Sequence, residues 1–105
     1  MDEVTLAKES YQLVRKDLGL EEEIQFEGFD NAFDRLLIFL TKQINELLDH
    51  DFNRLLNALY RIDIPENQVK CLLESTPPNE IAAALAAAVI EREKQKVLTR
   101  LKYRS

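Results

Sequence analysis

The chain has 105 residues, of which 46% are hydrophobic and 31% are charged, and its formal net charge is −5. This length is typical of a single domain, so we expect one helical domain over residues 1–105. The apolar content argues against disorder, and two glycines with three prolines are too few for the frequent turns of an all-β fold. One histidine, one cysteine and no tryptophan leave little material for catalysis or metal binding.

The start of the chain and its longest apolar run bear on cellular location. The first residues include Asp2, Glu3 and Glu9, where a secretion signal would be basic and then apolar. The longest uncharged apolar run, 81–90, is about half of the ~20 residues needed to span a bilayer. A lone cysteine fits a reducing compartment. These features predict a cytoplasmic protein without membrane contact, and the small, tail-free form favours a bacterial one.

Residues 2–18 have the apolar spacing of an amphipathic helix. Side chains on one of its faces recur at intervals of three and four: Val4, Ala7, Tyr11, Val14 and Leu18. Gly19 follows directly, where a left-handed C-cap belongs. Residues 20–29 lack helical spacing, so we expect a loop there, with a short extra helix as the alternative. Three large apolar side chains of this loop would close one end of the core: Ile24, Phe26 and Phe29.

Two further helices are expected between residues 30 and 61. Asp30 can cap the first, and Asp34 lies in its first turn, where acids are favourable. The broad apolar stripe of this helix predicts a central position or contact with a partner: Phe33, Leu36, Leu37, Ile38, Phe39, Leu40, Ile44, Leu47 and Leu48. Asp51 can cap the next helix, which ends near Arg61, and the sequence leaves open whether the two helices are continuous. The stripe of this next helix consists of Phe52, Leu55, Leu56, Leu59 and Tyr60.

Prolines mark the last two helices. Residues 62–65 form a short connector, and Pro65 suits the first turn of a fourth helix with the apolar residues Val69, Leu72 and Leu73. Thr76 can cap the final helix, with Pro77 at its first position. That helix runs without glycine or proline to about Lys102, and its ~26 residues would span roughly 39 Å, against roughly 35 Å for a domain of this size. It therefore spans the domain or projects beyond it.

These elements predict an all-α fold, a compact bundle of about five helices with a long C-terminal helix. That helix is alanine-rich at its start and basic at its end. Alanine favours helix formation, and its small side chain lets a neighbouring helix come close. We therefore expect the alanine run at 82–88 to form the central packing seam.

Few residues could support chemistry. Glu46, Asp49, His50 and Asp51 are close in the chain, but the carboxylate-bridged metal sites of helix bundles need more than one histidine. We therefore expect a polar helix junction there. Nothing in the sequence brings Cys71 to His50 as nucleophile and base, and there is no glycine-rich phosphate loop or serine elbow. The sequence predicts no enzyme, no cofactor, no metal site and no small-molecule substrate.

Residues 58–74 also have part of the pattern of a helix–turn–helix DNA-binding unit. The apolar positions of that unit would be Ala58, Ile62, Ile64, Val69 and Leu72. Two departures weaken this interpretation, since Leu59 stands where a small residue is expected and Asp63 replaces the turn glycine. Glu66 and Glu74 on the recognition helix would repel phosphates. Two packed helices with a tight corner explain the same spacing, so nucleic-acid binding is the alternative interpretation.

Charge is distributed unevenly along the chain. Residues 1–90 carry a net charge of −9, and residues 91–105 carry +4. Within the basic segment the pairs Glu91–Lys94 and Glu93–Lys96 have helical contact spacing with the acid first, which is the favourable order. These pairs predict a solvated helix end.

An apolar face accompanies the basic segment. One helical face carries Ile90, Val97 and Leu101. This face would extend past the domain and be exposed to water unless a partner covers it. The expected partner is a second copy of the chain or another protein, and the expected contact residues are Ile90, Lys94, Val97, Leu101 and Arg104. The predicted function is non-catalytic protein–protein interaction, by self-association through the C-terminal helix. The alternative is a nucleic-acid-associated regulator that uses residues 58–74 or the basic end.

Overall fold

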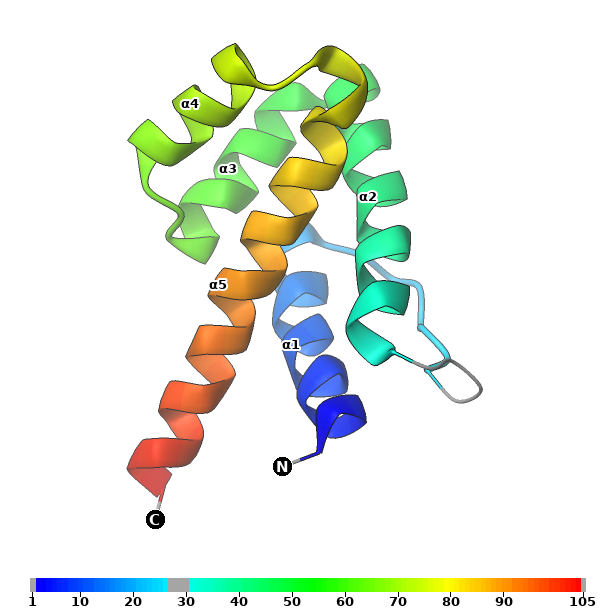
Figure 1. The fold of residues 1–105 in the computed structure, drawn as a ribbon, viewed down its shortest axis with the longest axis vertical. Coiled ribbons are helices and arrows are strands. Elements are labelled where there is room, and N and C mark those ends of the chain that lie inside the picture. The colour runs from blue at the N-terminus through cyan, green and yellow to red at the C-terminus, as the bar shows by residue number, and fades with distance from the viewer. Residues whose placement is uncertain (1, 27–30, 105) are drawn as a thin grey trace.

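The computed structural model describes residues 2–26 and 31–104 of the chain. These residues form five α-helices and one 3₁₀ turn, without a strand (Figure 1). The elements are α1 (Glu3–Leu18), α2 (Ala32–His50), α3 (Phe52–Ile62), α4 (Glu66–Ser75), the turn η1 (Pro78–Glu80) and α5 (Ile81–Arg104). The predicted all-α bundle of about five helices with a long C-terminal helix is therefore confirmed.

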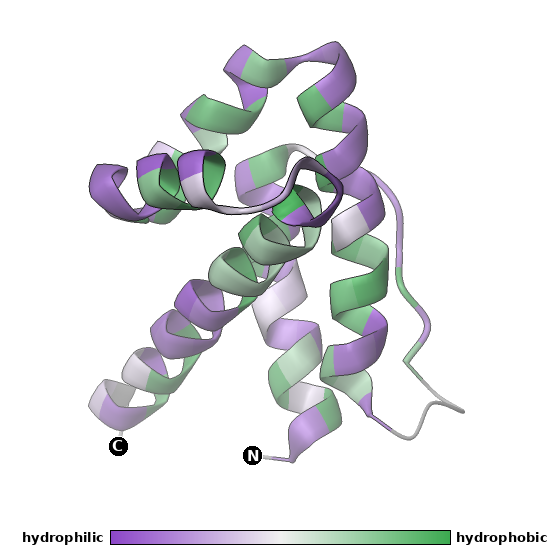
Figure 2. Cartoon of the chain, turned by 45° about the horizontal axis from the view of Figure 1, so that its top comes forward, coloured by the Kyte–Doolittle hydropathy of each residue, from purple (hydrophilic) through white to green (hydrophobic). Residues whose placement is uncertain are grey.

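The last helix, α5, is the centre of the bundle. It packs against each of the other four helices, most extensively against α2 and α1 (Figure 1). Its 24 residues correspond to roughly 36 Å, close to the longest dimension of the molecule, 39 Å. Ala82 and Ala86 are buried whereas Ala83 and Ala87 are exposed, so the alanine run packs through one face. Apolar residues dominate the first half of α5 and hydrophilic ones its second half (Figure 2).

The end of α1 is held by a glycine and an arginine from α3. Gly19 adopts the predicted left-handed conformation, with φ 68°. The Arg54 guanidinium donates hydrogen bonds to the carbonyl oxygens of Leu18 (2.7 Å) and Gly19 (2.9 Å). A Cβ atom at position 19 would lie 2.9 Å from the same guanidinium nitrogen. The left-handed backbone conformation therefore favours glycine at this position, and a Cβ atom there would also require the flexible end of the Arg54 side chain to shift.

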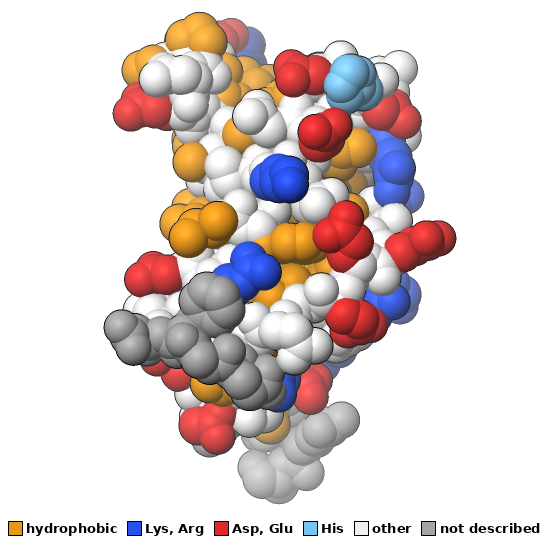
Figure 3. Space-filling model, turned by 90° about the vertical axis from the view of Figure 1, so that its right-hand side faces the viewer, with side chains coloured by type: hydrophobic (Ala, Val, Ile, Leu, Met, Phe, Trp, Pro, Cys, Tyr) orange, Lys and Arg blue, Asp and Glu red, His pale blue; other side chains and the backbone are white. Residues whose placement is uncertain are grey.

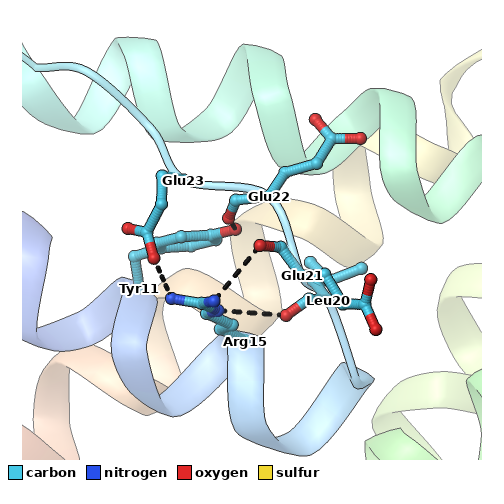
Figure 4. Close-up of polar contacts among 6 residues, drawn as sticks. All are labelled: Tyr11, Arg15, Leu20, Glu21, Glu22 and Glu23. Carbon is cyan, nitrogen blue, oxygen red and sulfur yellow. Dashed lines mark hydrogen bonds and ion pairs between the residues drawn. The ribbon is translucent and has the colours of Figure 1, made fainter.

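The segment after α1 is a loop, as predicted over the residues that the structure describes. Arg15 donates to the carbonyl oxygens of Leu20 and Glu21, at 3.1 Å each, and pairs with the Glu23 carboxylate (Figure 4). The Tyr11 hydroxyl donates to the carbonyl oxygen of Glu22. Of the three loop side chains expected to close one end of the core, Ile24 and Phe26 are buried in it. The third, Phe29, lies outside the described residues.

The start of α2 differs by one position from the prediction. The cap is Asn31, whose side-chain oxygen accepts hydrogen bonds from the backbone amides of Phe33 (2.9 Å) and Asp34 (3.2 Å). Because the helix begins at Ala32, only the residue directly before it can reach these amides. The predicted cap, Asp30, lies outside the described residues.

The helices α2 and α3 are separate, and Asp51 terminates one and begins the other. Its backbone amide donates to the Leu47 carbonyl oxygen (2.9 Å), and its carboxylate accepts from the Arg54 amide (3.2 Å). The predicted cap at Asp51 is therefore confirmed.

The apolar stripe of α2 is narrower than expected, because Ile38 is 68% exposed.

The corners around α4 correct three details of the prediction. Helix α3 includes Ile62, and Pro65 precedes α4 as its cap residue rather than entering its first turn. Thr76 was expected to cap the last helix but instead ends α4, with its amide 3.2 Å from the Leu72 carbonyl oxygen. Pro77, expected at the first position of the last helix, is instead the cap residue of a 3₁₀ turn before α5. Pro78 takes the first position of that turn, where its missing amide costs no helical hydrogen bond.

Candidate protein-binding surfaces

An open apolar groove lies between α3 and α4. Its volume is about 310 Å³. Apolar side chains from the two helices and their connection form its walls: Leu56, Leu59, Tyr60, Ile64, Val69 and Leu73. Three charged side chains of α4 complete the lining: Glu66, Lys70 and Glu74. We call this feature the α3–α4 groove.

The depth of the groove follows from which of its side chains belong to the core. Leu59, Ile64 and Val69 are buried and form its floor. Leu56 and Leu73 are only half-buried, and Tyr60 is 60% exposed. The groove therefore offers the edges of several large apolar side chains to a partner.

The connection between α3 and α4 explains why the groove lies at this corner. Asp63 adopts a left-handed conformation, with φ 70° and ψ 44°, and its amide donates to the carbonyl oxygen of Tyr60 (3.0 Å). Aspartate tolerates this conformation better than most residues that carry a side chain. The chain thus reverses within three residues, and Ile64 turns into the core between the two helices.

The second half of α5 is a basic segment. After Glu93 it contains no acid but five cations: Lys94, Lys96, Arg100, Lys102 and Arg104. Among these, Leu98 is 46% exposed, Tyr103 is 80% exposed and Leu101 is half-buried. We call residues 94–104 the basic end of α5.

The structure distributes the five predicted partner-binding residues over different environments. Ile90 and Val97 are buried within the chain itself. Lys94 is half-buried, with its Nζ atom 4.9 Å from the centre of the Phe33 ring, a cation–π contact with α2. Leu101 keeps part of its surface exposed, and the side chain of Arg104 lies outside the described part.

Helix α1 accounts for the burial at Val97. A shallow hollow of about 340 Å³ joins Val97, Arg100 and Leu101 to side chains of α1, among them Gln12 and Leu13. Because α1 runs beside α5 this far, the body of the same chain covers part of the face that the sequence left without a partner. The surface open to another molecule is displaced toward Leu98 and Tyr103.

A buried carboxyl, Glu93, departs from the expected solvated helix end. Its side chain is 0% exposed. One of its oxygens accepts from Lys96 Nζ at 3.2 Å, as the spacing predicted, and the other, Oε2, has no hydrogen-bond partner. Burial raises the pKa of Glu93 to about 7; Lys96 opposes this rise, and the neighbouring Asp17 carboxyl of α1 adds to it.

The sequence carried a signal for this burial. Glu93 stands four residues from Val89 and four from Val97, so that it shares a helical face with two core residues. In the other expected pair, Glu91–Lys94, the lysine instead contacts another element. Lys94 lies against Phe33, and the neighbouring Arg92 donates to the Asp63 carboxylate at 3.1 Å.

The positions that the helix–turn–helix pattern requires to be apolar are covered in the structure. Four of these are buried and Leu72 is half-buried, the buried ones being Ala58, Ile62, Ile64 and Val69. The departure from the pattern at Asp63 is accommodated, because this residue adopts the left-handed conformation expected of the turn glycine. Yet α4 presents Glu66 and Glu74 against the single cation Lys70.

The residues considered for metal binding and nucleophilic catalysis are all exposed at the surface. His50 Nε2 lies 3.9 Å from Glu46 Oε2, and both side chains are exposed. Within residues 2–26 and 31–104, no group of three or more His, Cys, Asp or Glu side chains could hold a metal ion. Cys71 is exposed on α4, with its Sγ atom 4.0 Å from Ser75 Oγ. On the face shown in Figure 3, charged side chains lie among small, separate apolar groups.

None of the described helices is both long enough and apolar enough to cross a membrane. Comparisons with protein-family models, with curated protein sequences and with solved structures find no match to this chain.

Proposed function

We propose that the chain is a non-catalytic protein that acts by protein–protein contact, and that it associates with a second copy of itself. The observation that carries this proposal is the α3–α4 groove. Contiguous apolar surface with a charged rim is typical of sites where proteins dock. The exposed side chain of Tyr60 is of a type that often anchors such contacts.

The dimensions and chemistry of the groove favour a protein over a small ligand. Its volume of about 310 Å³ is at the lower limit of small-molecule sites, which run from ~300 to ~1,000 Å³. Such sites also place a few polar groups to orient the ligand, whereas the polar groups here are long charged side chains at the rim.

The proposed cellular location is a reducing compartment such as the bacterial cytoplasm, which suits the exposed thiol of Cys71.

The second copy is favoured by charge. The first 90 residues carry −9 and the last 15 carry +4, so two copies can oppose regions of unlike sign. The proposed complex then consists of copies of this chain alone.

The proposal is tested by the mass of the protein in solution. Sedimentation or light scattering is expected to give about twice the 12.2 kDa of one chain. Tyr60→Glu places a charge in the groove and is expected to give the single-chain mass. Ile38→Glu changes a similarly exposed apolar residue on α2 and serves as the matched control. A wild-type protein that stays monomeric at millimolar concentration would refute self-association.

DNA binding through α4 is a second candidate, favoured by the left-handed turn at Asp63 and by the burial of the apolar positions of the helix–turn–helix pattern. The excess of acid on α4 weighs against it, because phosphate neutralisation supplies much of the affinity for DNA. This candidate predicts a mobility shift of duplex DNA at low salt that disappears as salt is raised. No shift at about 50 mM salt, where non-specific binding is strong, eliminates it.

A further inference from the structure

Building on the proposed function, we infer that the α3–α4 groove receives the basic end of α5 from a second copy of the chain. The contact is reciprocal, so that each copy gives its basic end and receives that of the other. Four features support this assignment: the reach of α5, the exposed apolar residues, the distribution of charge and the placement of the two surfaces.

The basic end cannot fill the groove of its own chain. Helix α5 is continuous from Ile81 to Arg104. It leads away from α4, so that its C-terminus and α4 lie at opposite ends of the longest axis (Figure 1). A basic end that enters a groove must therefore belong to another copy.

The apolar residues of the two surfaces complement each other. Leu98 and Leu101 are three residues apart and so are neighbours on the surface of α5, where both keep exposed area. The groove presents Leu56, Tyr60 and Leu73, which are likewise incompletely covered. Contact between the two surfaces would remove these side chains from water, which is the main favourable contribution to most protein association.

The charges select this pairing over its closest competitor. The groove is lined by two acids, Glu66 and Glu74, against one cation, Lys70. The basic end carries Arg100 close to Leu98 and Leu101. If two basic ends met each other instead, five cations would face five cations with no acid between them. Like charges in contact oppose association, so the acidic rim is the better partner.

The placement of the two surfaces allows a closed pair. Helix α4 and the C-terminus lie on the same side of the molecule, the left in Figure 1, and at opposite ends of its longest axis. A two-fold rotation about an axis beside this side of the molecule, perpendicular to its longest dimension, therefore places the basic end of each copy next to the α4 end of the other. Two equivalent contacts result, and the assembly closes as a dimer instead of growing into a filament.

The experiment uses one full-length variant of each surface. Tyr60→Glu disables the groove and leaves the basic end intact, whereas Leu98→Glu disables the basic end and leaves the groove intact. Both residues are substantially exposed, so the fold is retained, and circular dichroism with thermal unfolding checks this. We expect each variant alone to dissociate, with its dimer dissociation constant raised roughly tenfold or more. The Ile38→Glu variant should remain a dimer.

Mixing the two variants provides the decisive measurement. A mixed dimer retains one intact contact, between the basic end of the Tyr60→Glu chain and the groove of the Leu98→Glu chain. Native mass spectrometry, which resolves the two masses, should detect this mixed dimer at concentrations where each variant alone is monomeric. A contact between two identical surfaces would show no such rescue.

The possible failures are distinguishable. If the wild-type chain is monomeric, both the proposed function and this inference fail. If Tyr60→Glu dissociates the dimer but Leu98→Glu does not, the groove binds a different segment, so that this inference fails and the proposed function stands. Absence of the mixed dimer, when both single variants are folded monomers, also overturns the reciprocal contact.

Discussion

At the level of single residues, the burial of Glu93 gives the protein a pH dependence. Its pKa is raised to about 7, from an ordinary value of 4.5, by burial and the nearby Asp17 carboxyl in spite of Lys96. The folded chain therefore binds a proton more tightly than the unfolded chain does. As the pH rises from 4.5 to 7, this difference lowers the stability of the fold, and above 7 the loss is complete.

Glu93→Gln removes this titration. We expect the variant to gain stability relative to the wild type as the pH is raised from 4 to 8, by on the order of 3 kcal/mol. Urea unfolding of both proteins across this range measures the difference, with the exposed Glu91→Gln as the control. A difference in unfolding free energy that stays constant with pH contradicts the assignment.

At the level of secondary-structure elements, Asp51 determines where α2 ends and α3 begins. Removing its carboxylate leaves the Arg54 amide without its cap, and the Arg54 guanidinium also holds the end of α1. Asp51→Ala is therefore expected to destabilise the fold by about 1 kcal/mol, the usual effect of losing a helix cap.

Urea unfolding of Asp51→Ala provides the measurement. Asp51→Asn should lose much less, because an amide oxygen can accept the same hydrogen bond. Asp49→Ala, at an exposed position in the last turn of α2, is the matched control. Equal losses for alanine and asparagine at position 51 would exclude a capping role.

The helices themselves were predictable from the sequence because their signals are local. The apolar spacing of α1 with Gly19 after it, and the cap at Asp51, depend on residues a few positions apart. The error at Asp30 is a one-residue error about which side chain reaches the first amides of α2. Local pattern cannot settle it, since neighbouring polar residues are equally suited to cap a helix. Thr76 ends α4 instead, and the turn before α5 begins after Pro77 without a side-chain cap.

The candidate sites were less predictable, because they depend on how helices lie against one another. The burial of Val97 requires α1 alongside α5, and that of Glu93 requires a packed face at the same level. The α3–α4 groove contains Tyr60 and Leu73, which the sequence assigns to the apolar stripes of separate helices. Periodicity places such residues on a face, but it does not reveal whether the opposite helix covers them.

At the level of the whole molecule, the separation of charge predicts a salt dependence of association. A dimer that joins a basic end to an acid-rimmed groove should weaken as salt screens this attraction, since the screening length falls from ~10 Å at 0.1 M to ~3 Å at 1 M. We expect the dissociation constant to rise roughly tenfold over that range. Sedimentation at several salt concentrations measures it. A dimer that tightens with salt would mean that apolar contact alone holds it.

The position of α5 in the chain has a consequence for biosynthesis. The helix against which all the others pack is also the last of the five to leave the ribosome. Until it emerges, α1 and α2 can pack only against each other and α3, so the core stays incomplete until residues from 81 onward have been made. Completion of the bundle therefore waits for the synthesis of α5, and in that interval the apolar surfaces that α5 later covers are exposed to chaperones.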